Sequence, residues 1–487
     1  MINKSKILLN LQCPKRLWLS LYKTELAIDK QSIEAKKHEG DEVGIMARSL
    51  YPEGFLIAET KNQLAIQETK KALDRSGQRP LFEAAFVHDD VMVRSDLLIP
   101  EYGSYRLEEV KSSTKVKPYH IQDAAIQNWV LEGSGHKPTR VLISYINNKF
   151  NYEKLGDYQG LFSSEDVTET VKKLSSTVAI WVDEAKATIN KTEEPLRDTG
   201  RHCKEPFECP FIDHCSPKNS QEKFPLSILP NASKLREALL SDGYKCLTDV
   251  PDAILTNEKH KRILRVSKSG EPELDAEASK ILNQLSYPWF FLDFETIAYA
   301  VPRWIGTHPY MQVPFQWSCH IKRTADCSIE KAGHKDFLDI TGKDPRENFI
   351  TSLLEAVEKD GTIFVYNEAF EKSRIKELQR DFPKYTELLD DINLRIFDLL
   401  KIARDYYYHP DMMGSWSIKA VLPTVYAGAT YNELAVKDGT MAQDEYLRAL
   451  SLHTSYDERK EIDKNLKDYC ALDTLSMWRL ANRFVQI

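Results

Sequence analysis

One stretch of nine residues constrains this chain more than any other, because it joins a buried strand to two acids. Pro288 is followed by four apolar residues and then by Asp-Phe-Glu-Thr, which ends at Thr296. An apolar run of this length behind a proline predicts a strand that is buried on both faces. Asp293 and Glu295 come where we expect this strand to end. Side chains two positions apart in a strand point the same way, so both acids project side by side from an apolar sheet.

This pair of acids has two interpretations. Two carboxylates this close repel each other unless a cation lies between them. The simplest cation is a divalent metal held by oxygen atoms, either Mg²⁺ or Mn²⁺. The alternative is an ordinary strand end that reaches solvent. The motif alone favours neither, so residues elsewhere in the chain have to decide.

Length and composition bound the architecture. At 487 residues the chain is too long for one core, and two or three domains are expected. No apolar run approaches the roughly 20 residues that cross a membrane. The apolar run at residues 7–9 is too short for a signal peptide, so we expect a cytoplasmic protein. The net charge of −7 argues against a nonspecific nucleic-acid coat, yet a local basic groove is compatible with it.

The first part of the chain predicts a small α/β core. The expected elements, in chain order, are helices at residues 11–22, 30–50 and 61–76, strands at 81–86, 91–99 and 105–110, a helix at 118–133 and a strand at 140–145. Turn residues separate the strands. Helices and strands that follow one another in this way indicate helices packed against one sheet.

Two acids and a lysine lie on the strands of this core. Asp96 is expected at the end of one strand, and Glu109 and Lys111 share a face of the next. Such a group can bind a metal and stabilise the charge that develops on a phosphate. A structural salt bridge would explain Lys111 with one acid, but not Asp96 arriving from the neighbouring strand. The sequence therefore predicts an active site here.

The pattern Asp96, then Glu109 and Lys111 around a valine, resembles the D…ExK core of PD-(D/E)XK nucleases. The following segment, HIQDAAIQNWVLEG, resembles the glutamine-bearing helix of their RecB-like branch, which implies that Gln127 is that glutamine. A tyrosine four residues later is common in the branch, and Leu131 stands there instead. The resemblance therefore implies a restriction-endonuclease-like fold with a partly met motif.

Two further residues belong to the same resemblance. His38, in KKHEGDEVG, resembles the helical histidine that contributes a metal ligand in the RecB-like branch. Glu83, in LFEAAF, matches an acid often found on the first strand. For His38 taken alone, a solvated helix histidine is the ordinary interpretation.

Four of the eight cysteines have an informative spacing. Cys13 stands alone in CPKRLW, whereas Cys203, Cys209 and Cys215 fall within thirteen residues in HCKEPFECPFIDHC. Cysteines of a cytosolic chain rarely form disulfides. This arrangement resembles the iron–sulfur RecB-like nucleases, which include AddB-type nucleases and those associated with CRISPR adaptation. The resemblance implies that these four cysteines bind a [4Fe–4S] cluster, which closes the domain at residues 1–218.

Two other interpretations of the cysteines stay open. Zinc could bind the three clustered cysteines together with His202 or His214. Buried free cysteines are the third possibility. Iron–sulfur is favoured over zinc because only the cluster gives Cys13 a role.

Residues 219–285 predict a helical connector. A polar, proline-containing linker at 216–230 leads into short helical segments. Residues 256–270 carry five Lys or Arg residues, which is weakly similar to helix–hairpin–helix units that contact DNA phosphates. A packing spacer between domains is the favoured interpretation.

The last part of the chain alternates strands and helices again. The expected elements are strands at 313–322, 328–331 and 361–366, a helix at 345–359, a helix at 367–380, a short strand at 396–399 and a long helix at 459–485. The long helix carries Tyr469 and Asp473 one turn apart on one face. Asp398, another acid at a strand end, is interpreted as structural.

Three motifs in this order resemble the DnaQ-like, or DEDD, 3′–5′ exonucleases of the RNase H-like fold. DFET matches the first motif, YNEAFE the second and YCALD the third in its tyrosine form. The resemblance implies that two Mg²⁺ or Mn²⁺ ions bind four acids, and that Tyr469 orients the attacking water. The implied ligands are Asp293, Glu295, Glu371 and Asp473. Glu371 stands where aspartate is usual, so its longer side chain has to be absorbed by the helix position.

The whole chain resembles bacterial proteins that fuse an iron–sulfur RecB-like nuclease to a DnaQ-like domain. This implies an α/β protein with a PD-(D/E)XK core, a helical connector and an RNase H-like mixed sheet with helices at residues 286–487. Both halves are then expected to hydrolyse DNA in a metal-dependent reaction, with single strands or ends preferred. An RNA-processing exonuclease is one alternative, and a nucleic-acid-binding scaffold with one inactive half is another. No membrane partner is expected.

Aromatic side chains near the DEDD motifs are candidates for stacking on terminal bases, although most aromatics of this kind lie in a core. These candidates are Trp304, Tyr310, Trp317 and Trp416.

Overall fold

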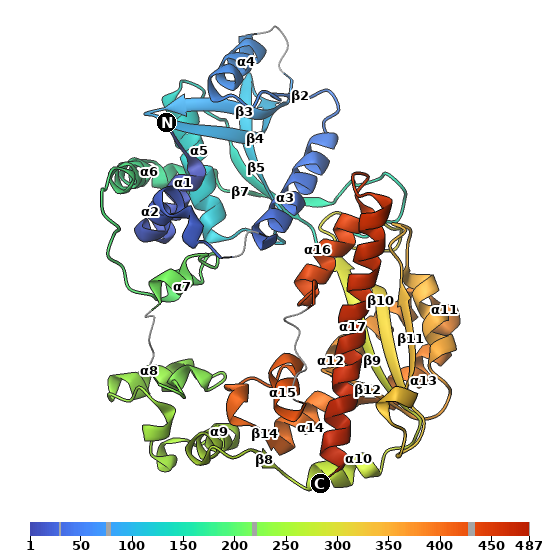
Figure 1. Cartoon of the computed structure of the whole chain (residues 1–487). Helices are drawn as coiled ribbons and strands as arrows, with labels where there is room; N and C mark the ends of the chain where they lie inside the picture. Colours follow the sequence, from blue (N-terminus) through green and yellow to red (C-terminus); the bar gives the residue numbers. More distant parts are fainter. Residues whose placement is uncertain (29–30, 75–78, 217–221, 427–433, 487) are drawn as a thin grey trace. The chain divides into compact units, whose positions relative to one another are not determined.

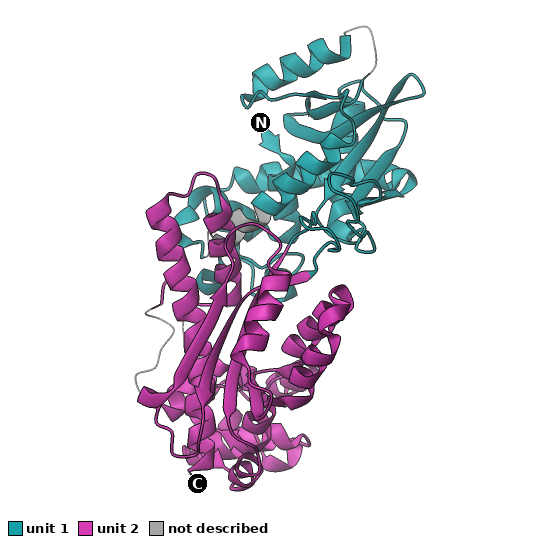
Figure 2. Ribbon diagram, turned by 90° about the vertical axis from the view of Figure 1, so that its right-hand side faces the viewer, with its two compact units in different colours: residues 1–218, 299–311 teal, residues 219–298, 312–487 magenta. Residues whose placement is uncertain are grey.

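The computed structural model describes residues 1–28, 31–74, 79–216, 222–426 and 434–486, without the side chains of residues 31–37. The chain is an α/β protein (Figure 1), and its contacts divide it into two compact units (Figure 2). Unit 1 comprises Met1–Lys218 and Tyr299–Met311, and unit 2 comprises Asn219–Ala298 and Gln312–Ile487. None of the described helices has the length and apolar character that a membrane crossing requires.

Unit 1 contains one mixed sheet. Its strands, in spatial order, are β2 (Phe55–Leu56), β3 (Leu81–His88), β4 (Val91–Glu101), β5 (Ser104–Lys111), β6 (Val141–Ile146) and β7 (Phe162–Asp166), with β1 (Ile2–Asn3) beside β4. β3, β4 and β5 form an antiparallel meander, and β6 runs parallel to β5. Helix α5 (Pro118–Gly133) makes the crossover between β5 and β6, as parallel neighbours require.

Helices cover this sheet through apolar side chains. They are α1 (Lys4–Gln12), α2 (Pro14–Tyr22), α3 (Gln31–Ser49), α4 (Asn62–Asp74), α5 and α6 (Thr168–Ile189). The short α7 (Ile212–Cys215) instead packs with α2 beside the cysteines. The helix expected at residues 11–22 is interrupted at Cys13, which is extended and separates α1 from α2, and Pro14 opens the second helix. Helices α1, α5 and α6 pack on one another over the strands.

The segment Tyr299–Met311 belongs to unit 1 although it connects two strands of unit 2. Tyr152 and this segment exchange backbone hydrogen bonds, from the Tyr152 amide to the Thr307 carbonyl (2.9 Å) and from the Gly306 amide to the Tyr152 carbonyl (2.8 Å). Ala300 and Val301 join a small apolar cluster of unit 1.

Unit 2 is built on a five-stranded sheet. Its strands, in spatial order, are β11 (Gly333–Leu338), β10 (Gln312–Lys322), β9 (Trp289–Ala298), β12 (Thr362–Val365) and β13 (Ile396–Asp398). β9, β10 and β11 are antiparallel neighbours, whereas β12 and β13 run parallel to β9. The strand predicted at residues 328–331 is wrong: Ile329–Lys331 is a 3₁₀ turn, and β11 begins after it.

Helices lie on both faces of this sheet (Figure 1). Alternate residues of β9 separate the faces: Phe290, Leu292 and Phe294 share a core with α11 (Arg346–Ala356), α12 (Glu368–Asp381) and α13 (Thr386–Arg395). Trp289 and Phe291 instead share a core with the long helix α17 (Tyr456–Val485). By the same alternation, Asp293 and Glu295 point to the α17 face.

The position of the two acids in β9 differs from the prediction. β9 pairs with β10 as far as Ala298, whereas its pairing with β12 ends at Phe291. Asp293 and Glu295 therefore lie inside the strand and not at its end. Both acids come after Phe291, where the pairing of β9 with β12 ends. Beyond this residue β9 has a neighbouring strand on one side only, which is β10.

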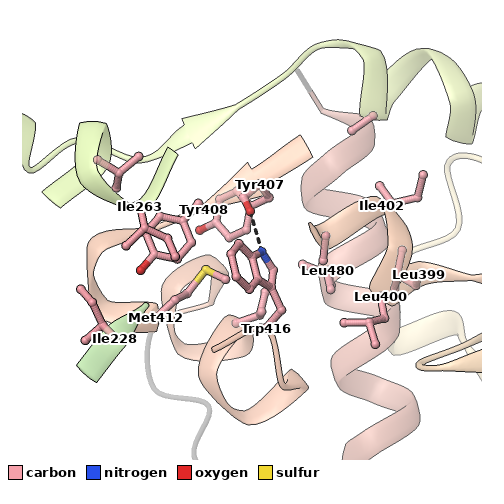
Figure 3. Packing of buried hydrophobic residues seen from close by; sticks show 14 of the residues in the cluster. Ile228, Ile263, Leu399, Leu400, Ile402, Tyr407, Tyr408, Met412, Trp416 and Leu480 are labelled. Atoms are coloured by element: carbon pink, nitrogen blue, oxygen red, sulfur yellow. Dashed lines mark hydrogen bonds between the residues drawn. The ribbon is translucent and has the colours of Figure 1, made fainter. Parts of the chain in front are cut away.

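Residues 222–285, which the sequence predicts as part of a connector, share the core of unit 2. Their helices α8 (Ser233–Ser241), α9 (Glu258–Ser269) and α10 (Glu277–Asn283) pack with α14 (Leu399–Tyr406), α15 (Ile418–Val425) and α17. Figure 3 shows Ile263 beside Tyr408. It also shows the indole N–H of Trp416, which donates to the Tyr407 carbonyl (2.9 Å).

The basic residues of α9 form ion pairs within this region. Arg262 and Arg265 pair with Glu273 (3.1 and 3.0 Å), and Lys268 pairs with Asp252 (2.7 Å). These pairs favour the packing interpretation of α9 over a DNA-contacting one.

A glycine fixes the start of β12 beside β9. Gly361 has a left-handed backbone (φ +98°), and a Cβ there would lie 2.1 Å from the Pro288 carbonyl oxygen. Gly270 is also left-handed (φ +73°) but has no heavy atom within 4 Å of such a Cβ. We expect Gly270→Ala to cost about 1 kcal/mol and Gly361→Ala to cost about 1–3 kcal/mol more, because its backbone must also move. Urea unfolding of the two variants checks this, and equal losses would contradict it.

Candidate metal-binding sites

Three acids of unit 2 converge on one point. Asp293 and Glu295 come from β9, and Asp473 comes from α17, which lies against β9 and β10. One carboxylate oxygen from each lies within 4.8 Å of the other two. Glu295 and Asp473 are less than a tenth exposed, so these acids do not form an ordinary strand end in solvent. In the described part of the chain, no other three His, Cys, Asp or Glu ligand atoms meet this distance.

Glu371 approaches the same acids from α12. Asn367, in a left-handed conformation, turns the chain from β12 into this helix, so that Glu371 falls in the first helical turn. Its side chain is 2% exposed, and its Oε2 atom has no hydrogen-bond partner. Burial raises its pKa well above the ordinary value, and the nearby Asp293 raises it further. A buried carboxylate oxygen without a donor suits a cation ligand.

Asp398 has the structural role that the sequence predicts. Its Oδ1 atom accepts hydrogen bonds from the backbone amides of Asn367 and Leu400, both at 3.0 Å. The first bond holds the turn before α12, and the second caps α14. Asp398 thus positions the helix that carries Glu371.

The acids of unit 2 are poorly compensated by protein groups. Burial raises the pKa of Asp293 and Glu295 well above the ordinary range, and neighbouring carboxylates add to this. The Asp293 Oδ2 atom accepts a weak bond from the Cys470 thiol (3.6 Å). A buried group of like charges with oxygen donors is the setting in which a divalent cation binds.

Tyr469 and Lys419 border this group of acids. Tyr469 is buried on α17, and burial together with the acids raises the pKa of its phenol, which therefore stays protonated. Lys419, on α15, has its Nζ atom 5.5 Å from the Tyr469 ring centroid and donates to the Lys437 carbonyl. Its charge lowers the pKa of Asp293 and Glu295. Lys419 was not among the predicted site residues, and its only signal is its position in the apolar segment SWSIKAVLP.

A second polar cluster lies in unit 1, between β5 and α5. Lys111 Nζ is 2.6 Å from Glu109 Oε1 and 2.6 Å from Asp123 Oδ2. The Gln127 amide donates to Glu109 and also to Asp123 Oδ1 (3.1 Å). Asp96 Oδ2 accepts from the Val110 amide (2.8 Å). The structure therefore gathers the predicted Asp96, Glu109, Lys111 and Gln127, although Asp96 lies within β4 and not at its end.

Asp123 and Lys4 complete this cluster, and the sequence analysis missed both. Lys4 Nζ lies 2.9 Å from Glu109 Oε1 and 3.1 Å from Asp123 Oδ1. The pairing of β1 with Val91 and Met92 of β4 brings Lys4 to this place. Asp123 had a usable signal, because it lies four residues before Gln127 on the same helical face. Lys4 had none, since it arrives through a two-residue strand.

The charges of this cluster compensate one another. Burial raises the pKa of Glu109 to about 7, and the neighbouring Asp123 and Asp96 contribute. Burial alone would raise the pKa of Asp123 as well, but the ammonium groups of Lys111 and Lys4 bring it below its usual range. These carboxylates therefore already have cationic partners from the protein.

Two residues of the RecB-like resemblance take other positions. His38 is exposed on α3, so the structure does not place it among the buried acids. Glu83 has a left-handed backbone (φ 54°) and pairs with Arg48 (3.1 Å). Burial raises the pKa of Glu83, and its charge neighbours include Lys4 and Glu109. Glu83 therefore lies near the cluster, whereas His38 does not join it.

The four predicted cysteines line one cavity in unit 1, and none forms a disulfide. Cys13 lies between α1 and α2, and the other three lie in the stretch that ends with α7. Burial raises the pKa of the Cys209 thiol, with Cys13 and Cys203 among its charge neighbours. Lys15, Arg16 and Arg197 also line the cavity.

The sulfur spacing bears on the choice of metal. Sulfurs on a tetrahedral zinc ion, bound at about 2.3 Å, lie about 3.8 Å apart. Among the described residues, no three cysteine sulfurs lie within 4.8 Å of one another. His214, a candidate zinc ligand, pairs with Glu194 (3.1 Å), and His202 Nε2 lies 3.6 Å from Cys203 Sγ. In the described part of the chain, the clustered cysteines therefore lack the sulfur spacing of a tetrahedral zinc site.

The predicted role of aromatic residues in base stacking is wrong for two of them. Trp317 and Trp416 are buried, and each belongs to an apolar core of unit 2. Trp304 is buried in the segment that belongs to unit 1, and Tyr310 lies half-buried in the same segment. Their apolar surfaces pack inside the protein, as large aromatics usually do.

Comparisons with known proteins give two matches. Residues 290–417 match a family described as a domain of unknown function, DUF2779. The matched part contains Asp293, Glu295 and Glu371, and ends before Asp473. The chain is also similar to the uncharacterized protein UU173 of Ureaplasma parvum serovar 3 (strain ATCC 700970), with 22% identity over 246 residues. This alignment covers 46% of the chain and spans 35% of the length of that relative. No solved structure matches the chain.

The acids of unit 2 predict an unusual response to neutralisation. Asp293→Asn removes one negative charge from the buried group, so we expect the metal-free protein to melt at a higher temperature than the parent. Added Mn²⁺ should then stabilise the parent by about 2–3 kcal/mol at 100 times its dissociation constant, and the variant much less. Thermal melting with and without Mn²⁺ measures both effects.

The control for this experiment is Asp326→Asn, at an exposed acid of unit 2. This variant should keep the full response to Mn²⁺. A metal response that is equal in the parent and in Asp293→Asn would show that the three acids do not form the binding site.

Proposed function

We propose that this protein is a metal-dependent nuclease with two active sites, one in each unit, that hydrolyse phosphodiester bonds of DNA. The observation that carries the proposal is the group of buried acids on β9, α12 and α17, in which three carboxylate oxygens lie within 4.8 Å of one another. The packing of an apolar core does not require a group of carboxylates. Phosphodiester hydrolysis by bound metal ions does require one, because the carboxylates hold the ions.

Topology supports a DnaQ-like assignment for the unit 2 site. Three antiparallel strands followed by two parallel ones, in the order β11-β10-β9-β12-β13, are the arrangement of the RNase H-like fold. The acids lie on the first strand of this sheet, on the helix after β12 and on the last helix. These are the positions at which the three DEDD motifs occur along the chain.

The acid group fits divalent ions, since its donors are carboxylate oxygens and Glu371 Oε2 has no other partner. Mg²⁺ or Mn²⁺ bound there supplies an activated water and neutralises charge on the leaving oxygen. Asp293, Glu295, Glu371 and Asp473 would hold the ions. Tyr469, with its phenol protonated, can hold the attacking water in line by a hydrogen bond. The proposed polarity is 3′–5′.

The unit 1 site is proposed as a PD-(D/E)XK centre. The meander β3-β4-β5, the crossover helix α5 and the parallel strand β6 are the core that such nucleases share. Lys111 is held by Glu109 and Asp123, which keep it charged, and its ammonium group would stabilise the charge that develops on a phosphate. Asp96 and Glu109 would provide the oxygen ligands of a metal ion.

A [4Fe–4S] cluster is the proposed occupant of the cysteine cavity. Four thiolates from Cys13, Cys203, Cys209 and Cys215 suit it in number and type. Bound there, the cluster would tie the start of α2 to the stretch near residue 215, which closes a long loop of the chain.

The first test separates the two nuclease sites. Full-length protein is incubated with end-labelled single-stranded DNA and Mn²⁺, and cleavage is compared for Asp293→Ala and Lys111→Ala. Each variant should lose one of two product patterns, with a rate loss of about 100-fold or more at the altered site. A double variant should be inactive.

Parallel RNA substrates accompany this assay, and Asp326→Ala serves as the exposed-acid control. Faster cleavage of RNA than of DNA by the unit 2 site would favour the RNA-processing alternative. Absence of metal-dependent cleavage above background by the parent protein would overturn the two-nuclease proposal.

The second test concerns the cysteines. Protein purified without oxygen should be brown and absorb near about 400 nm, as iron–sulfur proteins do. Cys209→Ser should lose this absorbance and most of its iron, whereas Cys327→Ser, at a partly exposed cysteine of unit 2, should keep both. Colourless parent protein that contains zinc would contradict the cluster.

A further inference from the structure

We propose that a groove in unit 1 binds single-stranded DNA next to the Lys111 site, an inference that rests on the nuclease function proposed for that site. The groove has a volume of about 810 Å³. Its walls are α1, the first turn of α5 and residues 202–207, which we name the cysteine loop. The side chains that matter to the argument are Gln12, Lys117, Tyr119, Arg197 and Phe207.

The groove combines exposed aromatic surface with positive charge. Phe207 is 47% exposed, and its ring meets that of Tyr119 edge-on at 4.7 Å between centroids. Lys117 Nζ lies 5.8 Å from the Tyr119 ring, and Arg197 lines the same space. The acid of the cysteine loop, Glu205, pairs with Arg201 (2.6 Å). Aromatic faces beside cations are the combination that binds unpaired bases and their phosphates.

The groove leads to the proposed catalytic residues through two helices. Tyr119 lies one helical turn before Asp123 on α5, and a turn rises about 5.4 Å along the helix axis. α1, which forms another wall, begins with Lys4, and Lys4 contacts Glu109 and Asp123. A strand whose bases stack in the groove therefore has its next phosphates beside Lys111. Duplex DNA keeps its bases stacked on one another and would leave Phe207 unused.

Gln12 holds the wall that carries Phe207. The Gln12 side-chain amide donates to the His202 carbonyl (2.8 Å) and to the Phe207 carbonyl (2.7 Å). Gln12 directly precedes Cys13, and Cys203 lies within the cysteine loop. Whatever joins the four cysteines thus also fixes the groove. A cluster held by these cysteines would fix this wall of the groove, and that role would need no redox change.

Binding can be measured without cleavage. Full-length, cluster-containing protein is titrated into fluorescein-labelled oligothymidine of about 16 nucleotides, without Mg²⁺ or Mn²⁺, and anisotropy reports the dissociation constant. Phe207→Ala should weaken binding by about 5-fold or more, since stacking of one base contributes at least about 1 kcal/mol. Phe207→Trp should restore it. The double variant Lys117→Ala/Arg197→Ala should also lower the salt slope by about 1.4, as expected for two lost phosphate contacts.

Matched controls use surface positions of unit 1 away from the groove. Tyr102→Ala removes an aromatic side chain that is 92% exposed, and Lys154→Ala removes an exposed lysine. Both should bind within about twofold of the parent. Melting temperature and absorbance near about 400 nm establish that each variant keeps its fold and cluster.

The outcomes separate this inference from the nuclease proposal. Groove variants that bind like the controls would overturn the groove, even if the parent protein cleaves DNA. In a parallel titration with labelled oligouridine of the same length, groove variants that lose RNA binding but keep DNA binding would overturn single-stranded DNA as the occupant. A parent protein that binds through the groove but shows no metal-dependent cleavage would support the groove and overturn the nuclease proposal alone.

Discussion

Repulsion among buried carboxylates is the constraint on which the rest of unit 2 depends. Asp293, Glu295, Glu371 and Asp473 are brought from three elements into one place, where burial and mutual charge disfavour ionisation. The apolar sheet and α17 must supply the stability that this group opposes, through aromatic packing around Trp289, Phe291 and Trp478. Ionisation of all these acids would require cations among them, so without such cations the group lowers the stability of the fold.

Unit 1 solves the same electrostatic problem in a different way. Lys111 and Lys4 each contact Glu109 and Asp123, so the protein itself supplies the opposite charges. A metal ion that binds Glu109 has to share that carboxylate with two ammonium groups and the Gln127 amide. Metal binding at Glu109 would therefore compete with ion pairs that the protein already makes.

Local patterns were sufficient for most elements and for residues that lie close together in sequence. The alternation of β9 placed Asp293 and Glu295 on one face, and the helical period aligned Tyr469 with Asp473. Positions set by pairing between distant segments could not be predicted. Lys4 reaches its cluster through the register of β1 with β4. Asp293 lies within a strand because β9 continues to pair with β10 after its pairing with the shorter β12 ends. Trp317 and Trp416 show the same limit. As aromatic residues near the DEDD motifs they were candidates for base stacking, but tertiary packing buries both.

The Gln12 side chain joins the cysteine loop to a part of unit 1 that is far from it in sequence. Gln12 and the His202 carbonyl are 190 residues apart, yet the adjacent Cys13 and Cys203 line the same cavity. Closing a loop of that length costs conformational entropy only once, and each additional bond across the same closure then forms at a smaller entropic cost. A cluster bound by these cysteines would therefore be cooperative with the two Gln12 bonds, and its loss would weaken the hydrogen bonds that hold Phe207 beside α5.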